Sequence, residues 1–155
     1  MNIKKKIAIS FFVICILTIL WNTLDSPEVS TQKSMSVLSF LTSHTNGNNP
    51  FWYFVHYNVR RIAHFGEFFL IGVALVVCCI SVKKRIKANI GNMLFVGLFL
   101  AVVDEAVQLL NNRGARVSDV LIDFLGVVIG MITTYMLYIM RRHYRGNGKN
   151  ESIDD

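Results

Sequence analysis

Four long apolar runs constrain the fold of this 155-residue chain more than any other feature of its sequence. Each run has about the 17–25 residues that an α-helix needs to cross a bilayer. The runs lie at about residues 7–24, 62–82, 90–110 and 120–140. Of all residues, 53% are hydrophobic, and the runs leave no room for a sizeable soluble domain. The sequence therefore predicts an all-α fold, an integral membrane four-helix bundle that includes residues 1–155 as one domain.

Basic residues flank these runs at alternate ends. Eleven of the sixteen Lys and Arg residues fall in three short clusters, at positions 4–6, 83–87 and 141–149. Cytoplasmic loops of membrane proteins are enriched in Lys and Arg. The pattern predicts a multi-pass cell-membrane protein with both termini in the cytoplasm (N-in/C-in). It also predicts a long extracytoplasmic loop at residues 25–60, between the first two helices, and a polar cytoplasmic tail at residues 141–155.

Charge and cysteine content narrow the partners. The net charge of +6 does not indicate nucleic-acid binding, because the basic residues are divided among short tails and one tight loop. The three cysteines, Cys15, Cys78 and Cys79, lie inside apolar runs and have no metal-ligand spacing. We therefore expect no cofactor, no bound metal and no nucleic-acid partner, and we expect membrane lipids to surround the chain.

Ionisable and polar residues nevertheless occur inside three of the runs or directly at their ends. An acidic or basic side chain at the centre of a membrane helix costs about 2.5–3.5 kcal/mol, so such residues usually face a protein interior or water. At 100° per residue they gather on one face of each helix. These residues are Arg61, His64 and Glu67 on the second helix, Asp104, Glu105 and Gln108 on the third, and Asp119 and Asp123 on the fourth.

The three polar faces are expected at a common depth. By helix rise, each lies about 5–10 Å inside the outer boundary of the membrane. The pattern predicts a shallow pocket near the outer leaflet, lined by carboxylates. Its rim would carry the arginines on either side, which are Arg60, Arg61, Arg113 and Arg116. On the fourth helix, Gly126 and Gly130 have the spacing that lets two membrane helices pack closely.

Three separated motifs carry a resemblance to a known family. They are RRIAHFGEF at residues 60–68, DEAVQ at residues 104–108 and RVSDVLIDFLGVVIG at residues 116–130. With these motifs and the number and order of its helices, the chain resembles the VanZ-like membrane proteins of bacteria. That family usually has Asn at the position of Asp123. The founding member is associated with low-level resistance to teicoplanin, a glycopeptide with a lipid tail, so the resemblance implies a role in the cell envelope and a contribution to resistance.

Three functions are compatible with the pocket. The favoured one is binding of a lipid headgroup, a lipid-linked peptidoglycan precursor or a lipoglycopeptide, because arginine recognises phosphate with two parallel hydrogen bonds. The second is an enzyme that acts on a lipid or lipid-phosphate headgroup, with acid–base residues drawn from His64, Glu67, Glu105 and Asp119. The third is a structural partner of another envelope protein, in which acids and arginines pair across helices and fix their packing.

Overall fold

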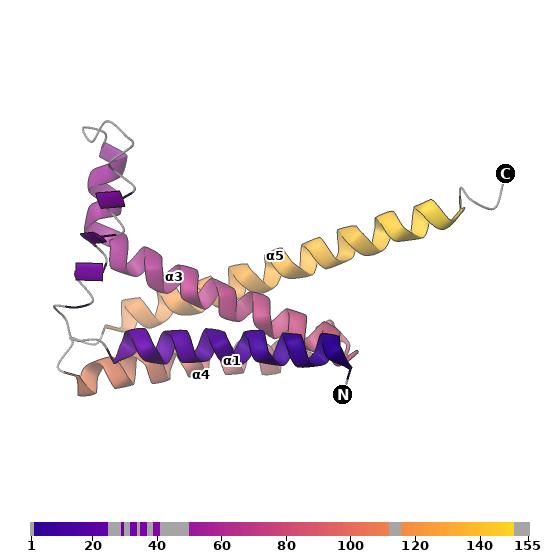
Figure 1. Ribbon diagram of the computed structural model, residues 1–155, viewed down its shortest axis with the longest axis horizontal. Helices are drawn as coiled ribbons and strands as arrows, with labels where there is room; N and C mark the ends of the chain where they lie inside the picture. Colours follow the sequence, from indigo (N-terminus) through magenta and orange to yellow (C-terminus); the bar gives the residue numbers. More distant parts are fainter. Residues whose placement is uncertain are drawn as a thin grey trace.

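The computed structural model describes residues 2–24, 29, 32–33, 35–36, 39–40, 50–111 and 116–150. Four long helices account for most of these residues: α1 (Ile3–Thr23), α3 (Pro50–Ser81), α4 (Ile86–Leu110) and α5 (Val117–Asn150). Helix α3 contacts each of the other three, and α5 crosses it at an angle (Figure 1). The predicted all-α bundle is confirmed.

Three of the described helices contain segments long and apolar enough to cross a membrane: Tyr57–Ser81, Ile86–Leu110 and Val117–Tyr144. Helix α1 forms where the sequence predicts it and packs against α3 and α4. Its first turn is capped by Asn2, whose side chain accepts a hydrogen bond from the backbone N–H of Lys4 (3.3 Å). Helix α1 does not belong to the set of membrane-crossing segments, so a fourth pass stays a prediction.

Large apolar side chains cover the outer faces of the bundle. On α4, Phe95 is 69% exposed and stacks on Phe99, with ring centroids 6.3 Å apart. On α5, Leu121, Ile132 and Met136 are exposed as well. An apolar surface on this scale is unfavourable in water, and a bilayer removes that cost. These faces are therefore the lipid-facing ones, and the protein is a membrane protein.

Helices α3 and α5 meet through glycine. A Cβ atom added to Gly126 of α5 would lie 2.6 Å from the carbonyl oxygen of Phe65, and one added to Gly130 would overlap the α3 backbone. Gly72 of α3 faces the α5 backbone in the same way. The two glycines that the sequence predicts to pack thus lie at the crossing, where the absence of a side chain lets the two backbones approach.

A tight turn joins α3 to α4. Lys83 has a φ of 58°, in the left-handed region that favours glycine. The backbone N–H of Lys84 donates to the carbonyl of Cys79 (3.1 Å), and that of Lys83 donates to the carbonyl of Ile80 (3.0 Å). This pair of hydrogen bonds is the Schellman motif, which satisfies the last carbonyls of a helix. The turn makes α3 and α4 antiparallel neighbours.

Basic residues gather at one end of the bundle, where the N-terminus and the α3–α4 turn lie together (Figure 1). The Sγ of Cys78, near the end of α3, donates to the carbonyl of Ala8 in α1 (3.3 Å). A cavity of about 510 Å³ at this end is lined by Lys83, Lys84, Arg85, Lys87 and Arg142, among others. This shared end agrees with the predicted cytoplasmic side, and the orientation in a membrane stays a prediction.

Two helices extend beyond the apolar runs from which they were predicted. Helix α3 begins at Pro50, so residues 50–60 of the predicted loop are helical. Helix α5 continues to Asn150, so residues 141–150 of the predicted tail are helical. Proline suits the start of a helix, and no proline follows Pro50 in the chain. The apolar runs predict only which part of each helix contacts lipid. The backbone hydrogen bonds of α3 and α5 continue beyond these runs into polar residues.

Candidate functional site: a polar pocket at one end of the bundle

Polar side chains line a cavity of about 360 Å³ where the first half of α3, the last turns of α4 and the first turns of α5 come together. It lies at the end of the bundle opposite the basic clusters (Figure 1). Its lining residues are Tyr57, Arg60, Arg61, His64, Glu105, Gln108, Arg116, Asp119, Ile122 and Asp123. Apart from Tyr57 and Ile122, these are residues that the sequence predicts for the pocket or its rim.

Asp104 lies next to this cavity, is 1% exposed and accepts hydrogen bonds on both carboxylate oxygens. Its Oδ1 accepts from the hydroxyl of Thr23 on α1, and its Oδ2 accepts from Nε2 of Gln108 (2.6 Å). The Oε1 of Gln108 accepts in turn from Nη2 of Arg60 on α3 (2.6 Å). This chain of hydrogen bonds joins three helices and fixes the direction in which Asp104 points.

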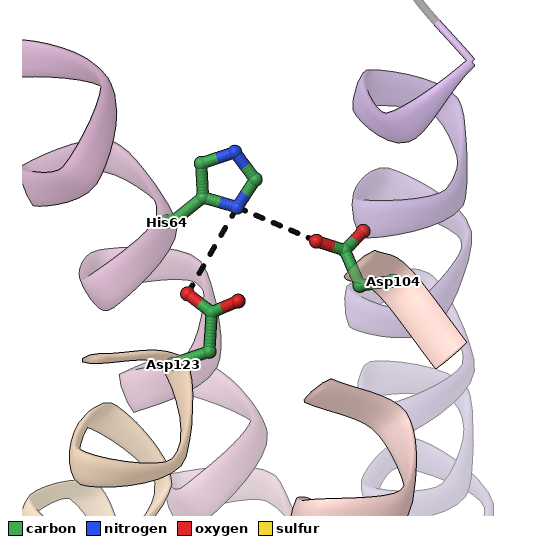
Figure 2. A group of neighbouring side chains, drawn as sticks. All are labelled: His64, Asp104 and Asp123. Carbon is green, nitrogen blue, oxygen red and sulfur yellow. Dashed lines mark ion pairs between the residues drawn. The ribbon is translucent and has the colours of Figure 1, made fainter. Parts of the chain in front are cut away.

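His64 on α3 faces two carboxylates that come from two other helices (Figure 2). Its Nδ1 lies 3.5 Å from Oδ2 of Asp104 and 3.9 Å from Oδ1 of Asp123. One donor atom from each residue lies within 4.8 Å of the other two. His64 and Asp123 also line the cavity, so the group is reached from that side. The sequence predicts no metal, yet these residue types at these distances are able to hold one.

Asp123 is the least satisfied polar residue of the site. It is 1% exposed, and neither of its carboxylate oxygens has a hydrogen-bond partner within the part of the chain that the structure describes. A buried carboxylate without such a partner is costly, because nothing replaces the water that it has lost. The imidazole of His64 lies 3.9 Å from Oδ1 of Asp123, beyond hydrogen-bond distance, so a bound cation or donor would stabilise this carboxylate.

The rim of the cavity is held by two further contacts. The Nε of Arg61 lies 3.3 Å from Oδ1 of Asp119, and the side chains are 36% and 31% exposed. The backbone N–H of Arg116 donates to Oε1 of Glu105 (2.5 Å), which links α4 to the start of α5. The Arg116 side chain is exposed and lines the cavity.

Glu67 and Arg113 are predicted site residues that the structure does not place in the lining. Glu67 is turned toward α1, where its Oε1 accepts from Nδ2 of Asn22 (2.6 Å). Three residues along a helix correspond to a 60° difference in direction, which is enough to give His64 and Glu67 different neighbours. Among the residues considered for acid–base chemistry, His64, Glu105 and Asp119 line the cavity, and His64 faces Asp104 and Asp123. Arg113 lies outside the described residues.

Asn22 and Thr23 take part in the polar network without having been predicted. They are consecutive polar residues at the end of the first apolar run, directly after Trp21. This pair is the available signal in the sequence. To predict the partners of Asn22 and Thr23, one must know how α1 is rotated about its own axis. The apolar run that forms α1 has no polar face, so the sequence does not indicate this rotation.

Comparison with known proteins identifies the family of the chain. No curated protein and no solved structure matches the chain. The sequence model of the VanZ/LLP1 family matches residues 8–140. These residues include the central parts of all four helices and every described residue that lines the cavity. The chain belongs to the VanZ/LLP1 family.

Proposed function

We propose that the protein binds the anionic headgroup of a lipid-tailed molecule in the cavity, at the outer leaflet of the bacterial cell membrane. Candidates are a membrane phospholipid, a lipid-linked peptidoglycan precursor and a lipoglycopeptide such as teicoplanin. Binding in the cell envelope would give the protein a part in teicoplanin resistance. The observation that carries the proposal is the cavity itself, which brings three arginines to a space between membrane helices.

Arginine chemistry favours an anionic group. Each guanidinium presents a planar set of donors that matches a phosphate or carboxylate. Arg61 is partly exposed and donates from Nε to Asp119 (3.3 Å) and from Nη1 to Oδ1 of Asn58 (3.4 Å), while the Arg116 side chain is exposed. Both side chains can therefore turn toward a ligand without leaving a buried partner.

The walls of the cavity favour a ligand with an apolar part. Ile122 lines the cavity on α5, and its neighbour Leu121 is 61% exposed toward the lipid side of that helix. Leu125, one turn further, is 51% exposed. An acyl or polyprenyl chain could follow this face inside the bilayer while its headgroup enters the cavity, with van der Waals packing between the chain and these side chains.

The test measures binding by purified protein in nanodiscs. The probes are phosphatidylglycerol, undecaprenyl pyrophosphate and teicoplanin, each titrated separately so that the three sources of the headgroup are distinguished. The variants are Arg61→Gln and Arg116→Gln, and the matched control is Arg142→Gln at the opposite end of the bundle. We expect both variants to weaken binding of at least one probe by about tenfold or more, equal to about 1.4 kcal/mol. Equal affinities in all variants and the wild type would exclude this cavity as the site.

A second measurement addresses resistance. Expression in a susceptible bacterium should raise the teicoplanin concentration that inhibits growth, and Arg116→Gln should abolish the increase without reducing the amount of protein in the membrane. The Arg116→Gln change keeps the backbone N–H that donates to Glu105, so the link between α4 and α5 is preserved.

A further inference from the structure

We propose that His64, Asp104 and Asp123 bind one divalent metal ion, of the class that includes Zn²⁺ and Mn²⁺. The proposal rests on the geometry of these three residues and is independent of headgroup binding. An imidazole nitrogen suits zinc, and carboxylate oxygens suit manganese and the harder cations, so one nitrogen with two carboxylates favours this class.

The distances fit a shared ion. With metal–ligand bonds of about 2.0–2.2 Å, ligand atoms at tetrahedral angles lie about 3.3–3.6 Å apart. The Nδ1 of His64 lies 3.5 Å from the nearer oxygen of Asp104 and 3.9 Å from that of Asp123. The remaining pair also lies within 4.8 Å. Small side-chain rotations bring all three atoms to bonding distance, because they already point toward one another (Figure 2).

Charge and burial give the independent argument. Asp123 is 1% exposed and has no hydrogen bond to either oxygen from the residues that the structure describes. The carboxylate of Asp104, equally buried, faces the same imidazole nitrogen, Nδ1 of His64. Two carboxylates, a neutral imidazole and a divalent ion sum to zero charge. A neutral cluster avoids the large desolvation penalty that isolated charges carry inside a membrane protein.

The surroundings resemble those of a metal site that takes a further ligand. Thr23 and Gln108 donate to the two oxygens of Asp104, and outer contacts of this type orient metal ligands. Since His64 and Asp123 line the cavity, an ion between them has one side open to it. Zinc sites with three protein ligands use such a position for water or a substrate atom.

The experiment counts metal in the full chain. Protein in detergent is stripped with a chelator, dialysed against Zn²⁺ or Mn²⁺, and analysed by mass spectrometry of the elements. We expect about one equivalent of at least one of these ions per chain. Asp123→Asn and His64→Gln should each lose this equivalent or bind it at least about tenfold more weakly. Because the His64 side chain is partly exposed, we expect His64→Gln to fold. This variant therefore still tests the site if Asp123→Asn does not fold.

Glu67→Gln is the matched control, because Glu67 is another carboxylate on α3 that bonds to Asn22 and not to the cluster. This variant should keep the metal equivalent. A wild-type protein that retains neither ion would overturn the proposal, as would a loss in Glu67→Gln as large as that in Asp123→Asn. Failure of the Arg116→Gln test above, with metal retained, would reject headgroup binding and leave the metal site standing.

Discussion

The hydroxyl of Thr23 on α1 donates a buried hydrogen bond to the carboxylate of Asp104 on α4, across 81 positions of the chain. The same hydroxyl hydrogen is shared with the carbonyl of Ile19 one turn earlier (2.8 Å), as in a three-centre hydrogen bond. Thr23 is 1% exposed, so no water replaces either contact. The first helix is therefore tied to the residues next to the cavity by a side chain that hydropathy alone would treat as the end of an apolar run.

Replacing Thr23 by Val should remove this contact while keeping the shape of the side chain. We expect a loss of about 1–3 kcal/mol in the free energy of unfolding, because Asp104 loses a donor in a buried place. Thr18→Val is the control: Thr18 also bonds a carbonyl one turn earlier, is exposed and has no carboxylate partner among the described residues. Unfolding in mixed micelles measures both, and equal losses would contradict a special role for Thr23.

Glycine at the α3–α5 crossing should tolerate no added methyl group. Gly130→Ala places a Cβ against the α3 backbone, and we expect a destabilisation of about 1–3 kcal/mol from overpacking. A Cβ at Gly66 on α3 would meet no atom within 4 Å. Gly66→Ala should therefore be neutral or stabilising by up to about 1 kcal/mol, since alanine favours helix over glycine. Thermal unfolding in detergent distinguishes the two, and a reversed order would contradict the close approach.

The turn between α3 and α4 contains one strained residue, Lys83, and a glycine at this position should relieve the strain. Lys83 holds a left-handed conformation that costs a non-glycine residue about 1 kcal/mol. Lys83→Gly should raise the free energy of unfolding by about 0.5–1 kcal/mol. Lys84→Gly removes the same charge from a residue without a positive φ, so it should give no gain. A similar result from both variants would show that charge, and not backbone conformation, sets the effect.

Orientation in the membrane can be tested separately. A fluorescent reporter fused after Asp155 should be active in the cytoplasm, because the basic clusters flank that side of the helices. An alkaline phosphatase inserted near Asn48 should be active outside. An inactive alkaline phosphatase at this position would place the cavity on the wrong side for an outer-leaflet ligand, because the enzyme forms its disulfides only outside the cytoplasm.

Much of the architecture could be predicted because a bilayer imposes simple rules. The length of an apolar run fixes a helix, and a charge placed within a run marks a face that turns inward. These rules gave Asp104, Gln108 and Asp123 as inward residues, and the structure buries all three. Helix rise also predicts that the three polar faces lie at one level along the bundle, and their depth in the membrane stays a prediction.

The details that escaped prediction depend on rotation and on polar segments. Glu67 turns toward Asn22 because a small angular difference along α3 decides which neighbour it meets. The start of α3 at Pro50 directly follows the Asn and Gly residues at positions 46–49, a combination that favours a turn. The grouping of His64 with Asp104 and Asp123 requires three helices to be docked, and no motif within one helix encodes it.

The contact at Gly126 and Gly130 has one more consequence, for the space on either side of it. Helices that cross at an angle approach closely at the crossing and separate on either side of it (Figure 1). The two cavities lie on either side of this crossing. The first, whose lining includes Tyr57 and Asp123, has equal numbers of acidic residues and arginines. The second, whose lining includes Ile80 and Arg142, has only basic charged residues. The crossing therefore separates a cavity of mixed charge at one end of the bundle from a cationic cavity at the other, and its closest contacts are made by glycines, which have no side chain.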